Sequence, residues 1–589
     1  MQLKEHTTAR KLRGGYYTDR VLADYIVNQI ELSKDLTILE PSCGDGVFLR
    51  SMRKYIPDQY IDSVDAVEVI KEEVDVILSE SWNSKYHIEC NDFFKFYHSN
   101  NEKKYKLILG NPPYIRYQYL SKEQREIQSE ILKKNGMTPN KLIYSWVCFL
   151  VACVERLEEN GQIGFVIPAE LLQIVYAQQL RQYLTNELSK IILVTFKELV
   201  FEGIEQEVVV LIATKRTMNK VDSEQEDKLI HNQKKRINKN GSTNKKEPNK
   251  DQEVSNKTQK ESFQNQNESK IAVVEFQNLK DLKPLKDIPL NFQQLEPTKD
   301  KWTKYFLSTK ENMMIKNIMN RKDFCTFDDI SIVNVGITTG NNKYFSVDKK
   351  TVEKYKLQEV VLPLIGRSSH AHGIYFTKED WMKNVSENTK AYLINFPENI
   401  SFNEYPKLHK KYIHEGEKNN DHIGYKCGIR DRWYIVPSVW VPDAFFLRRN
   451  NTFPKFVRNN INAVSTDTMH RIKFKDGVNG EKALLSYYNS ITFAFTEIAG
   501  RSYGGGVLEI LPREVGGIRL PDLQDFDEDK TKELLKIIDH YVRNKLDIEE
   551  LLDIVDQAVL VEYKGISLKE VNCYRAIWKK LMSRRLERS

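Results

Sequence analysis

The stretch "LTILEPSCGDGVFLRSM" (36–52) places an apolar strand, an acidic residue, a glycine-containing loop and the start of a helix in one run. Gly44 and Gly46 allow the backbone to approach a ligand closely, and Glu40 and Asp45 add carboxylates beside them. The run is neither a P-loop, because no GK[ST] follows, nor the GxGxxG of a dinucleotide fold. Such a turn also occurs without any ligand, but its carboxylates favour a ligand with hydroxyls and a cationic amine over a pyrophosphate.

The surrounding sequence alternates apolar strand-like runs with helical patterns up to residue 214. After the strand at 36–41, further strands are expected at 63–69, 106–113, 161–168, 191–196 and 207–214, with helices at 121–134 and 144–157. This alternation predicts an α/β domain over 1–214 with a mostly parallel, Rossmann-like sheet. Ligands of such sheets bind at the carboxyl ends of the strands.

Composition narrows the class of protein. A chain of 589 residues is too long for one core, and its net charge of +7 permits nucleic acid as a partner without demanding it. The seven cysteines are scattered, with no CxxC pair and no histidine at zinc spacing, so we expect neither disulfides nor a metal site. The N-terminal stretch MQLKEHTTARKLRGG lacks the apolar run of a leader peptide, and no stretch approaches the roughly 18 apolar residues of a membrane span, so we expect a cytoplasmic protein without a membrane partner.

The rest of the chain divides by composition into three segments. Residues 215–270 are almost entirely polar and predict a disordered insertion or linker, whose lysines either touch DNA phosphates or serve as a solvated tether. Residues 271–520 mix short strand-like pieces with glycines, aromatics and arginines and predict a second domain of mixed α+β structure. Residues 521–589 predict a C-terminal helical segment.

Two further predicted strands end in residues suited to a nucleoside. The second strand ends at Glu68 and Val69, where nucleotide folds offer a carboxylate to ribose hydroxyls. The third ends near Asp92 and Phe93, which suit an adenine because the carboxylate accepts from its amino group while the ring packs on its face. Each residue alone is typical of a turn, but together they favour an adenosine-type ligand.

The strand at "LILGNPPYIRY" (107–117) ends in an amide, two prolines and an aromatic residue. The Asn111 side-chain oxygen and the Pro112 carbonyl can accept hydrogen bonds from one NH2 group, and the prolines fix the backbone so that these acceptors converge. Tyr114 supplies a stacking face. Two such acceptors can localise the lone pair of a base's amino group, which can then attack a methyl sulfonium. The competing interpretation is a proline-rich turn with a core tyrosine.

These motifs, in this order, resemble the S-adenosylmethionine-dependent DNA methyltransferases that modify adenine N6, in the gamma arrangement with a C-terminal target-recognition domain. The resemblance covers about 14–214 closely and the remainder loosely. "GGYYTDRVLADYIV" (14–27) resembles the family's first cofactor motif, although Asp19 stands where that motif usually has proline. The resemblance implies a cofactor site made of Tyr17, Thr18, Glu40, Ser42, Gly44, Asp45, Glu68, Val69, Asp92, Phe93 and Pro113.

The same resemblance implies a catalytic motif and a pocket for a flipped base. Asn111, Pro112 and Tyr114 match the catalytic NPPY motif. "VFEGIEQEVVV" (200–210) resembles the motif whose aromatic residue flanks the base, which suggests Phe201 opposite Tyr114, with Phe196 as a competitor. An enzyme acting on a base must take it out of the duplex. NPPY favours adenine over cytosine N4, and the amino-group chemistry excludes carbon-5 methylation of cytosine.

Three alternatives to this function stay open. The protein could methylate a protein glutamine, methylate ribosomal RNA, or act as a non-catalytic DNA-binding or assembly subunit. Double-stranded DNA is the expected partner, and any restriction endonuclease or defence partner would be a separate chain. "PDLQDFDEDK" (521–530) superficially resembles a nuclease motif but is too compact for one. His370 and His372 lack carboxylate companions for a metal. For DNA contacts we expect Arg367, Lys426, Arg430, Arg432, Arg501 and Tyr503.

Overall fold

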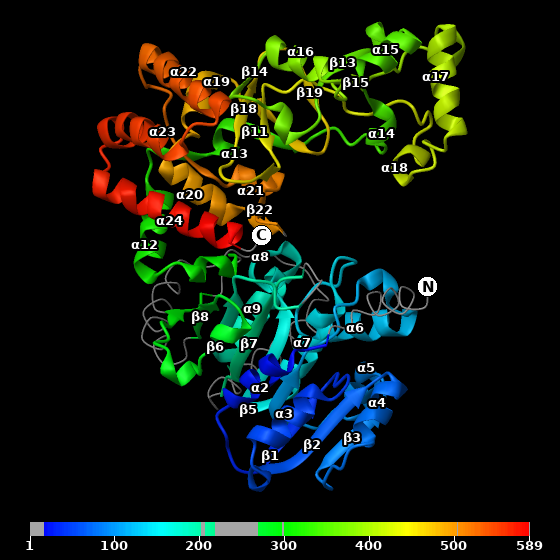
Figure 1. The fold of residues 1–589 in the computed structure, drawn as a ribbon, viewed down its shortest axis with the longest axis vertical. Helices are drawn as coiled ribbons and strands as arrows, with labels where there is room; N and C mark the ends of the chain where they lie inside the picture. The colour runs from blue at the N-terminus through cyan, green and yellow to red at the C-terminus, as the bar shows by residue number, and fades with distance from the viewer. Residues whose placement is uncertain (1–16, 202–205, 218–268, 297–299, 504, 588–589) are drawn as a thin grey trace, which may run out of the picture. The chain divides into compact units, whose positions relative to one another are not determined.

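The computed structural model describes residues 17–201, 206–217, 269–296, 300–503 and 505–587 (Figure 1). The chain divides into two compact units, Met1–Phe306 and Leu307–Ser589. The predicted linker at 215–270 lies almost entirely outside the described residues. Within the described ranges, no helix has both the length and the apolar character needed to cross a membrane.

The first unit is built on a nine-stranded sheet with the strand order β3-β2-β1-β4-β5-β7-β6-β8-β9. Strands β3, β2, β1, β4 and β5 run parallel, and β7 is antiparallel to both of its neighbours. This arrangement confirms the predicted Rossmann-like, mostly parallel sheet. The strands are β1 (Leu36–Glu40), β2 (Ile61–Glu68), β3 (Tyr86–Cys90), β4 (Tyr105–Gly110), β5 (Leu157–Pro168), β6 (Leu188–Phe196), β7 (Val208–Lys215), β8 (Lys270–Phe276) and β9 (Gln293–Gln294).

Helices connect these strands and bury their apolar faces in one core. The α6 helix begins with a capping box in which the Ser121 hydroxyl accepts from the Gln124 N–H and the Gln124 side chain accepts from the Ser121 N–H. The α7 helix is buried along almost its whole length. The helices are α2 (Arg20–Asn28), α3 (Val47–Tyr55), α4 (Lys71–Leu78), α5 (Phe93–Ser99), α6 (Lys122–Lys134), α7 (Ser145–Arg156), α8 (Glu170–Gln173) and α9 (Gln178–Glu187).

The sheet of the first unit continues beyond residue 214, which corrects the predicted boundary between domains. β8 pairs in parallel with β6 from Lys270 to Phe276, so the chain returns to the same sheet after the polar segment. The two ends of that segment contact each other, because the Arg216 guanidinium donates to the Ser269 hydroxyl. The composition change at 271 therefore does not mark the start of the second unit, which begins at Leu307.

The second unit contains four small sheets, in the strand orders β11-β20-β16-β18-β14, β12-β15-β13-β19, β17-β22-β21 and β10-β23. Its mixture of short strands and helices confirms the expected mixed α+β structure. The strands are β10 (Phe324–Thr326), β11 (Ser331–Val335), β12 (Ser346–Val347), β13 (Val361–Ile365), β14 (Tyr375–Phe376), β15 (Tyr392–Ile394), β16 (Ala444–Leu447), β17 (Arg449–Asn450), β18 (Phe456–Asn459), β19 (Val464–Ser465), β20 (Met469–Phe474), β21 (Arg501–Tyr503), β22 (Val507–Glu509) and β23 (Arg519–Pro521).

The C-terminal helices are part of the core of the second unit, which differs from their prediction as a separate segment. Trp578 is fully buried, and its ring centroid lies 5.4 Å from that of Phe493. The buried Arg585 guanidinium donates to both carboxylate oxygens of Glu497. The helices are α12 (Thr309–Asn320), α13 (Phe327–Ile330), α14 (Asn342–Phe345), α15 (Lys349–Tyr355), α16 (Lys378–Ser386), α17 (Lys407–Lys418), α18 (Tyr425–Gly428), α19 (Gly480–Leu485), α20 (Ser490–Ala499), α21 (Pro512–Gly516), α22 (Glu528–Asn544), α23 (Ile548–Val555) and α24 (Leu568–Leu586), with a π-helical turn at Asp556–Tyr563.

Candidate functional site

A cavity of about 490 Å³ lies at the carboxyl ends of β1, β2, β3 and β4 in the first unit. Parallel strands bring these ends to one edge of the sheet, so residues far apart in the sequence share one wall. Of the predicted cofactor residues, eight line the cavity directly: Tyr17, Ser42, Gly44, Glu68, Val69, Asp92, Phe93 and Pro113. Pro113 comes from the NPPY motif, and Asn111 of the same motif lines the cavity as well.

Glu68 holds the β1 and β2 ends of this cavity together. Its carboxylate accepts from the Gly44 N–H and from the Ile70 N–H, both at 2.9 Å. Burial raises the pKa of this carboxyl, while the hydrogen bonds from the two backbone donors act to lower it. Gly44 has a φ of +52°, a left-handed conformation that favours glycine and lets the loop turn toward the carboxylate.

Two of the predicted cofactor carboxylates lie outside the wall of the cavity. Glu40, at the end of β1, is 1% exposed and sits behind the loop. Burial raises the pKa of Glu40 well above its usual value, and the nearby carboxylates of Asp45 and Glu68 raise it further. The pKa of Asp45 is also raised, chiefly by burial, with Arg50 acting against that shift. These two residues therefore set the electrostatics of the loop and do not line the cavity.

Asp92 both caps a helix and faces the cavity. Its Oδ1 accepts from the Phe94 N–H at 2.9 Å and from the Lys95 N–H at 3.3 Å, which starts α5. Its Oδ2 accepts from Gln124 Nε2 at 2.9 Å, a contact from α6. The helix cap fixes the carboxylate, so Asp92 presents a rigid acceptor to the cavity.

Two stacked aromatic rings close the same side of the cavity. Phe93, at the start of α5, stacks on Phe149 of α7 with ring centroids 4.7 Å apart and planes 22° apart. Both residues line the cavity. Phe93 is only 4% exposed, so the two rings form one packed apolar wall that suits a flat ligand.

The NPPY loop is held in place at both of its ends. Asn111 Nδ2 donates to the Thr18 hydroxyl at 3.1 Å, which fixes the plane of the amide, and the Ser42 hydroxyl donates to the Asn111 carbonyl at 3.3 Å. At the other end, the Ser145 hydroxyl donates to the Pro113 carbonyl and accepts from the Ile115 N–H. The loop is therefore rigid, and Thr18, which does not line the cavity, acts by orienting Asn111.

The two aromatic residues predicted to flank a base are less exposed than that role suggests. Tyr114 is buried, and its hydroxyl donates to the Val166 carbonyl at 3.2 Å. Phe201 is also buried and lines a second, more open cavity of about 1280 Å³ that it shares with Tyr17 and Thr18. Phe196, the competitor of Phe201, is buried at the end of β6. Pro112 is buried beside Asn111.

Several residues of the cavity wall were missed by sequence reasoning. Ile70 follows the predicted Glu68 and Val69, and it belongs to the same strand end. Gln124, Gln128 and Phe149 come from α6 and α7, whose apolar periodicity indicates only that these helices pack against the sheet. Two glutamines four residues apart lie on one face of a helix, and this spacing was the available signal.

In the second unit, three of the arginines predicted to bind DNA are engaged by the protein itself. Arg430 donates to the Thr338 carbonyl at 3.1 Å, and Arg432 donates to the Ile400 carbonyl at 2.8 Å. Arg501 pairs with Glu514 at 2.9 Å. Within the described residues, the side chains of Arg367 and Lys426 form no hydrogen bond or ion pair. The Tyr503 side chain lies outside the described part of the chain.

The loop around α18 exposes large apolar side chains that composition alone did not single out. Ile423, Tyr425 and Ile429 are each more than half exposed, and Lys426 lies among them. Asn341 braces this loop, because its Nδ2 donates to the Asp421 carboxylate at 2.8 Å. The loop therefore places exposed apolar groups beside a basic side chain.

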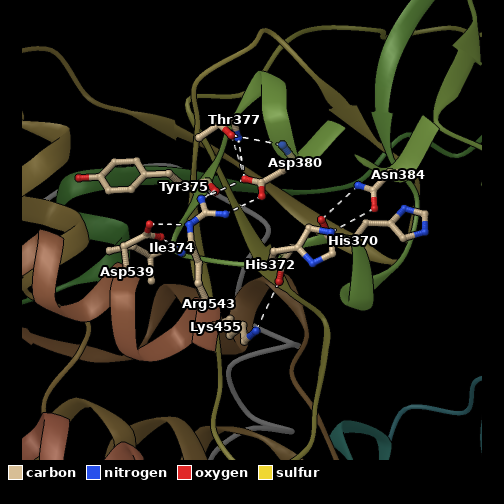
Figure 2. A network of polar contacts seen from close by, with 11 residues as sticks. His370, His372, Ile374, Tyr375, Thr377, Asp380, Asn384, Lys455, Asp539 and Arg543 are labelled. Carbon is tan, nitrogen blue, oxygen red and sulfur yellow. Dashed lines mark hydrogen bonds and ion pairs between the residues drawn. The ribbon is translucent and has the colours of Figure 1, made fainter. Parts of the chain in front are cut away.

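His370 and His372 belong to a structural network (Figure 2). His372 Nε2 lies 3.3 Å from the Asn384 Oδ1, and Asn384 donates to the His370 carbonyl at 3.3 Å. Burial lowers the pKa of His370, which favours the neutral form of its ring. In the described residues, no group of three or more His, Cys, Asp or Glu side chains has a geometry that would hold a metal ion.

The same network joins α22 to α16 through an arginine. Arg543 donates through Nη1 and Nη2 to the two Asp380 oxygens, at 2.5 and 3.0 Å, and pairs with Asp539 at 2.6 Å (Figure 2). Asp380 is 4% exposed. Burial would raise the pKa of Asp380, but the hydrogen bonds from Arg543 and Thr377 outweigh it and lower that pKa. Arg543 therefore stabilises the packing of α22 against α16 in the second unit.

Comparison with known proteins matches two family models to consecutive parts of the chain. Residues 2–301 match the model described as N-6 DNA Methylase. Residues 299–560 match the model of the C-terminal domain of the Type II methyltransferase M.Eco57I. The junction between the two matches lies close to the division between the compact units at Phe306 and Leu307.

Similar proteins include two Type II methyltransferases. M.AccI from Acinetobacter calcoaceticus is 24% identical over 587 residues, which cover 94% of both chains. M.HincII from Haemophilus influenzae is 29% identical over 204 residues, covering 33% of this chain and 36% of that protein. Among solved structures, the Type IIL restriction-modification enzyme MmeI in complex with DNA matches with a TM-score of 0.53 and 10% identity, over 93% of this chain and 73% of MmeI. That likeness concerns the fold.

Proposed function

Because this chain belongs to the N-6 DNA methylase family, we propose that it transfers a methyl group from S-adenosylmethionine to the N6 amino group of an adenine in duplex DNA. The relatives named Type II methyltransferases support a coarser statement directly: the chain is a DNA methyltransferase of a restriction-modification system. The choice of adenine N6, the capture of a flipped base and the residues in each role are parts of the proposal.

A single observation carries the proposal. The Asn111 amide stands in the wall of a cavity whose other sides carry Glu68 and Asp92, so an amine acceptor and two nucleoside-type acceptors border one space. Thr18 fixes the orientation of this amide through the 3.1 Å hydrogen bond from Asn111 Nδ2. The amide oxygen therefore lies at the opposite end of the group, directed away from Thr18.

The cavity fits S-adenosylmethionine in size and in the chemistry of its wall. Glu68 suits ribose hydroxyls, while Asp92 with Phe93 suits the edge and face of the adenine. Tyr17, Ser42 and Gly44 would enclose the amino-acid end, and Val69 and Pro113 would border the ribose and sulfonium. When bound, this cofactor supplies an electrophilic methyl group on a positively charged sulfur. The carboxylates Glu40 and Asp45 behind the loop favour that positive charge.

The residues of the NPPY loop activate the amino group without a strong base. The Asn111 side-chain oxygen and the Pro112 carbonyl accept the two N–H hydrogens of the base and localise the nitrogen lone pair toward the methyl group. As the N–C bond forms, the C–S bond breaks and its electron pair returns to sulfur; the nitrogen is then positively charged, and one of its two N–H protons becomes acidic. The same two oxygens hold that proton until water removes it. Ser145 pins the loop at Pro113 and Ile115, so the backbone beside the Pro112 carbonyl is held in place before the reaction.

Base capture is assigned to Tyr114 and Phe201. An enzyme acting on a base within a duplex must first extrude it and receive it between aromatic faces. Both side chains are buried in the described state, so their faces become available only as the base enters. Phe201 is supported by its position in the larger cavity, which Thr18 also lines. Thr18 in turn contacts Asn111 of the catalytic loop.

DNA binding is assigned to the second unit. Arg367 and Lys426 are the strongest candidates, since their cationic groups are not engaged by described residues. Arg430, Arg432, Arg501 and Tyr503 remain part of the proposal, but the first three would have to exchange an internal partner for a phosphate or a base. A separate restriction endonuclease is the expected partner of the system.

The proposal is tested by methyl transfer from labelled S-adenosylmethionine to duplex DNA, RNA and protein in parallel reactions. We expect label in DNA alone, and in N6-methyladenine after digestion to nucleosides. Label in N4-methylcytosine would correct the base but keep the class of enzyme. Label in protein glutamine or RNA, with none in DNA, would overturn the proposed substrate.

A further inference from the structure

We propose that Arg116, two residues after Tyr114, binds a DNA phosphate beside the nucleotide whose base is extruded. The inference rests on the proposed function, since it adds a contact from the first unit to the same substrate. Arg116 lies outside the NPPY motif, and the arginines and lysines expected from the sequence to contact DNA all belong to the second unit.

Backbone hydrogen bonds fix the position of Arg116 next to the catalytic loop. The Ile115 N–H donates to the Ser145 hydroxyl at 3.0 Å, and the Ser145 N–H donates to the Ile115 carbonyl at 2.9 Å. On the other side, the Tyr119 N–H donates to the Arg116 carbonyl at 2.9 Å. Two residues of chain span about 7 Å at most, so the Cα atoms of Tyr114 and Arg116 lie no farther apart than that.

A pair of tyrosine rings positions the Arg116 guanidinium. Its Cζ lies 6.0 Å from the centre of the Tyr144 ring, within the range of a cation–π contact. Tyr144 stacks on Tyr176 with ring centroids 6.0 Å apart and planes 20° apart, and the Tyr176 hydroxyl donates to the Glu170 carboxylate. Burial raises the pKa of Glu170, while that hydrogen bond and the charge of Arg116 act to lower it. The rings therefore orient the guanidinium without using its N–H groups.

The Arg116 side chain is exposed, and its N–H groups have no hydrogen-bond or ion-pair partner among the described residues. The nearby Arg125 differs, because its guanidinium donates to the Tyr117 and Gln118 carbonyls. A guanidinium carries five N–H donors in a planar fork that matches two oxygens of a phosphate. Arg116 therefore offers this fork to a ligand, whereas Arg125 uses it to hold the chain.

The proposed reaction brings an anion to this place. A base that leaves the duplex and enters the pocket beside Asn111 and Tyr114 stays attached to its sugar and to the two flanking phosphates. Because Arg116 follows Tyr114 so closely along the chain, a phosphate of that nucleotide comes within reach of its side chain. Phosphate contacts position DNA without reading its sequence, so this contact holds the extruded nucleotide whatever the neighbouring bases are.

The test uses Arg116→Gln, which removes the charge, and Arg116→Lys, which keeps it, with a duplex that the wild type methylates. Fluorescence anisotropy over a salt series measures DNA binding. We expect Arg116→Gln to bind about 10-fold more weakly, with the slope of log affinity against log salt lower by about 1. Arg116→Lys should keep the slope and lose about threefold in affinity, because an ammonium cannot bind a phosphate through a planar fork.

Lys34→Gln is the matched control for the loss of one positive charge. Lys34 is exposed and precedes β1, so it lies at the edge of the sheet opposite the carboxyl ends of the strands. This variant should bind DNA with the affinity and the salt slope of the wild type. For all three variants, the unfolding temperature and the affinity for S-adenosylhomocysteine should equal those of the wild type. A fall in either quantity for Arg116→Gln would overturn the proposal, by assigning the residue to the fold or to the cofactor site.

Methylphosphonate linkages, in which a methyl group replaces one charged phosphate oxygen, identify the phosphate. Placed directly 5′ or 3′ of the target base, one of the two linkages should weaken binding to the wild type about 10-fold and binding to Arg116→Gln less than twofold. Equal losses in both proteins at both positions would overturn the proposal, as would an unchanged salt slope for Arg116→Gln. Absence of DNA methylation by the wild type would instead remove the proposed function.

Discussion

Buried carboxylates have opposite effects on stability in the two units of this protein. In the first unit Glu40 sits behind the cofactor loop with other carboxylates as neighbours, and its pKa is raised. In the second unit Asp380 is equally enclosed, but Arg543 and Thr377 hold it, and its pKa is lowered. The first arrangement costs stability and favours a cationic ligand, whereas the second stabilises the fold. Burial alone therefore does not identify a site, but the partners of the buried charge do.

The arginines of the second unit extend this contrast. Arg432 and Arg543 both donate to the chain itself, whereas Asn111 and Glu68 of the first unit face a cavity. Parallel strands direct whatever follows them to one edge of the sheet, so sequence order there implies position in space. Short strands in four separate sheets impose no such common edge, and an arginine among them can point inward or outward.

The largest effect is expected for Asn111→Ala, which tests whether a polar group of the first unit serves chemistry and not folding. Methyl transfer to DNA should fall about 100- to 1,000-fold, by analogy with removal of a polar group that stabilises charge in a transition state. Affinity for S-adenosylhomocysteine should stay within about threefold, and the unfolding temperature should hardly change. Retained methyl transfer would remove Asn111 from the mechanism.

A smaller effect is expected for Arg543→Leu, which leaves the buried Asp380 carboxylate without its main partner. We expect a loss of about 2 kcal/mol in the free energy of unfolding at pH 7, below the usual cost because the arginine is partly exposed. Urea unfolding measures this, with the exposed Arg513→Leu as control. The folded-state pKa of Asp380 lies below its usual 3.8, so its contribution is present above that pH and is lost as pH falls through the folded-state value.

Glu40→Gln should raise the free energy of unfolding, whereas Arg543→Leu should lower it. The folded-state pKa of Glu40 lies well above 4.5, so the wild type loses stability as pH rises from about 4.5 through the folded-state value. We expect the ligand-free variant to be more stable than the wild type by about 1 kcal/mol at pH 8, with the difference vanishing near pH 4.5. Unfolding curves across that range, beside the exposed Glu130→Gln, make the measurement. A difference that grows toward acid would contradict the assigned role.

The smallest effect is expected for Lys426→Ala, a side chain directed outward from α18. Binding to duplex DNA should weaken about threefold, and the slope of log affinity against log salt should fall by about 1, as for the loss of one phosphate contact. Fluorescence anisotropy over a salt series measures both quantities. Arg432→Ala should instead lower the unfolding temperature, because its guanidinium holds the Ile400 carbonyl. An unchanged salt slope for Lys426→Ala would place the DNA elsewhere.

The sheet of the first unit could be predicted from its sequence because each strand carries its own apolar run and turn. The edge residues Glu68, Asp92 and Asn111 followed from the same logic, and all three line the cavity. Gln128 was harder to predict, since its four-residue spacing from Gln124 indicates only a shared helix face and not that this face borders a cavity. The return of Lys270–Phe276 to the sheet could not be predicted, because pairing across a long insertion is a tertiary contact that no local pattern encodes.

The contact between Arg216 and Ser269 has a practical consequence for handling this protein. The two residues bracket the polar segment and are joined by a hydrogen bond, and β8 pairs with β6, so described contacts hold both ends of that segment at the sheet. Loop closure depends only weakly on loop length, by about 0.6 kcal/mol for each doubling. We therefore expect residues 218–268 to accept replacement by a short glycine–serine linker, or by an inserted fluorescent domain, with an unchanged unfolding temperature. A marked fall in that temperature would show that the segment supports the fold.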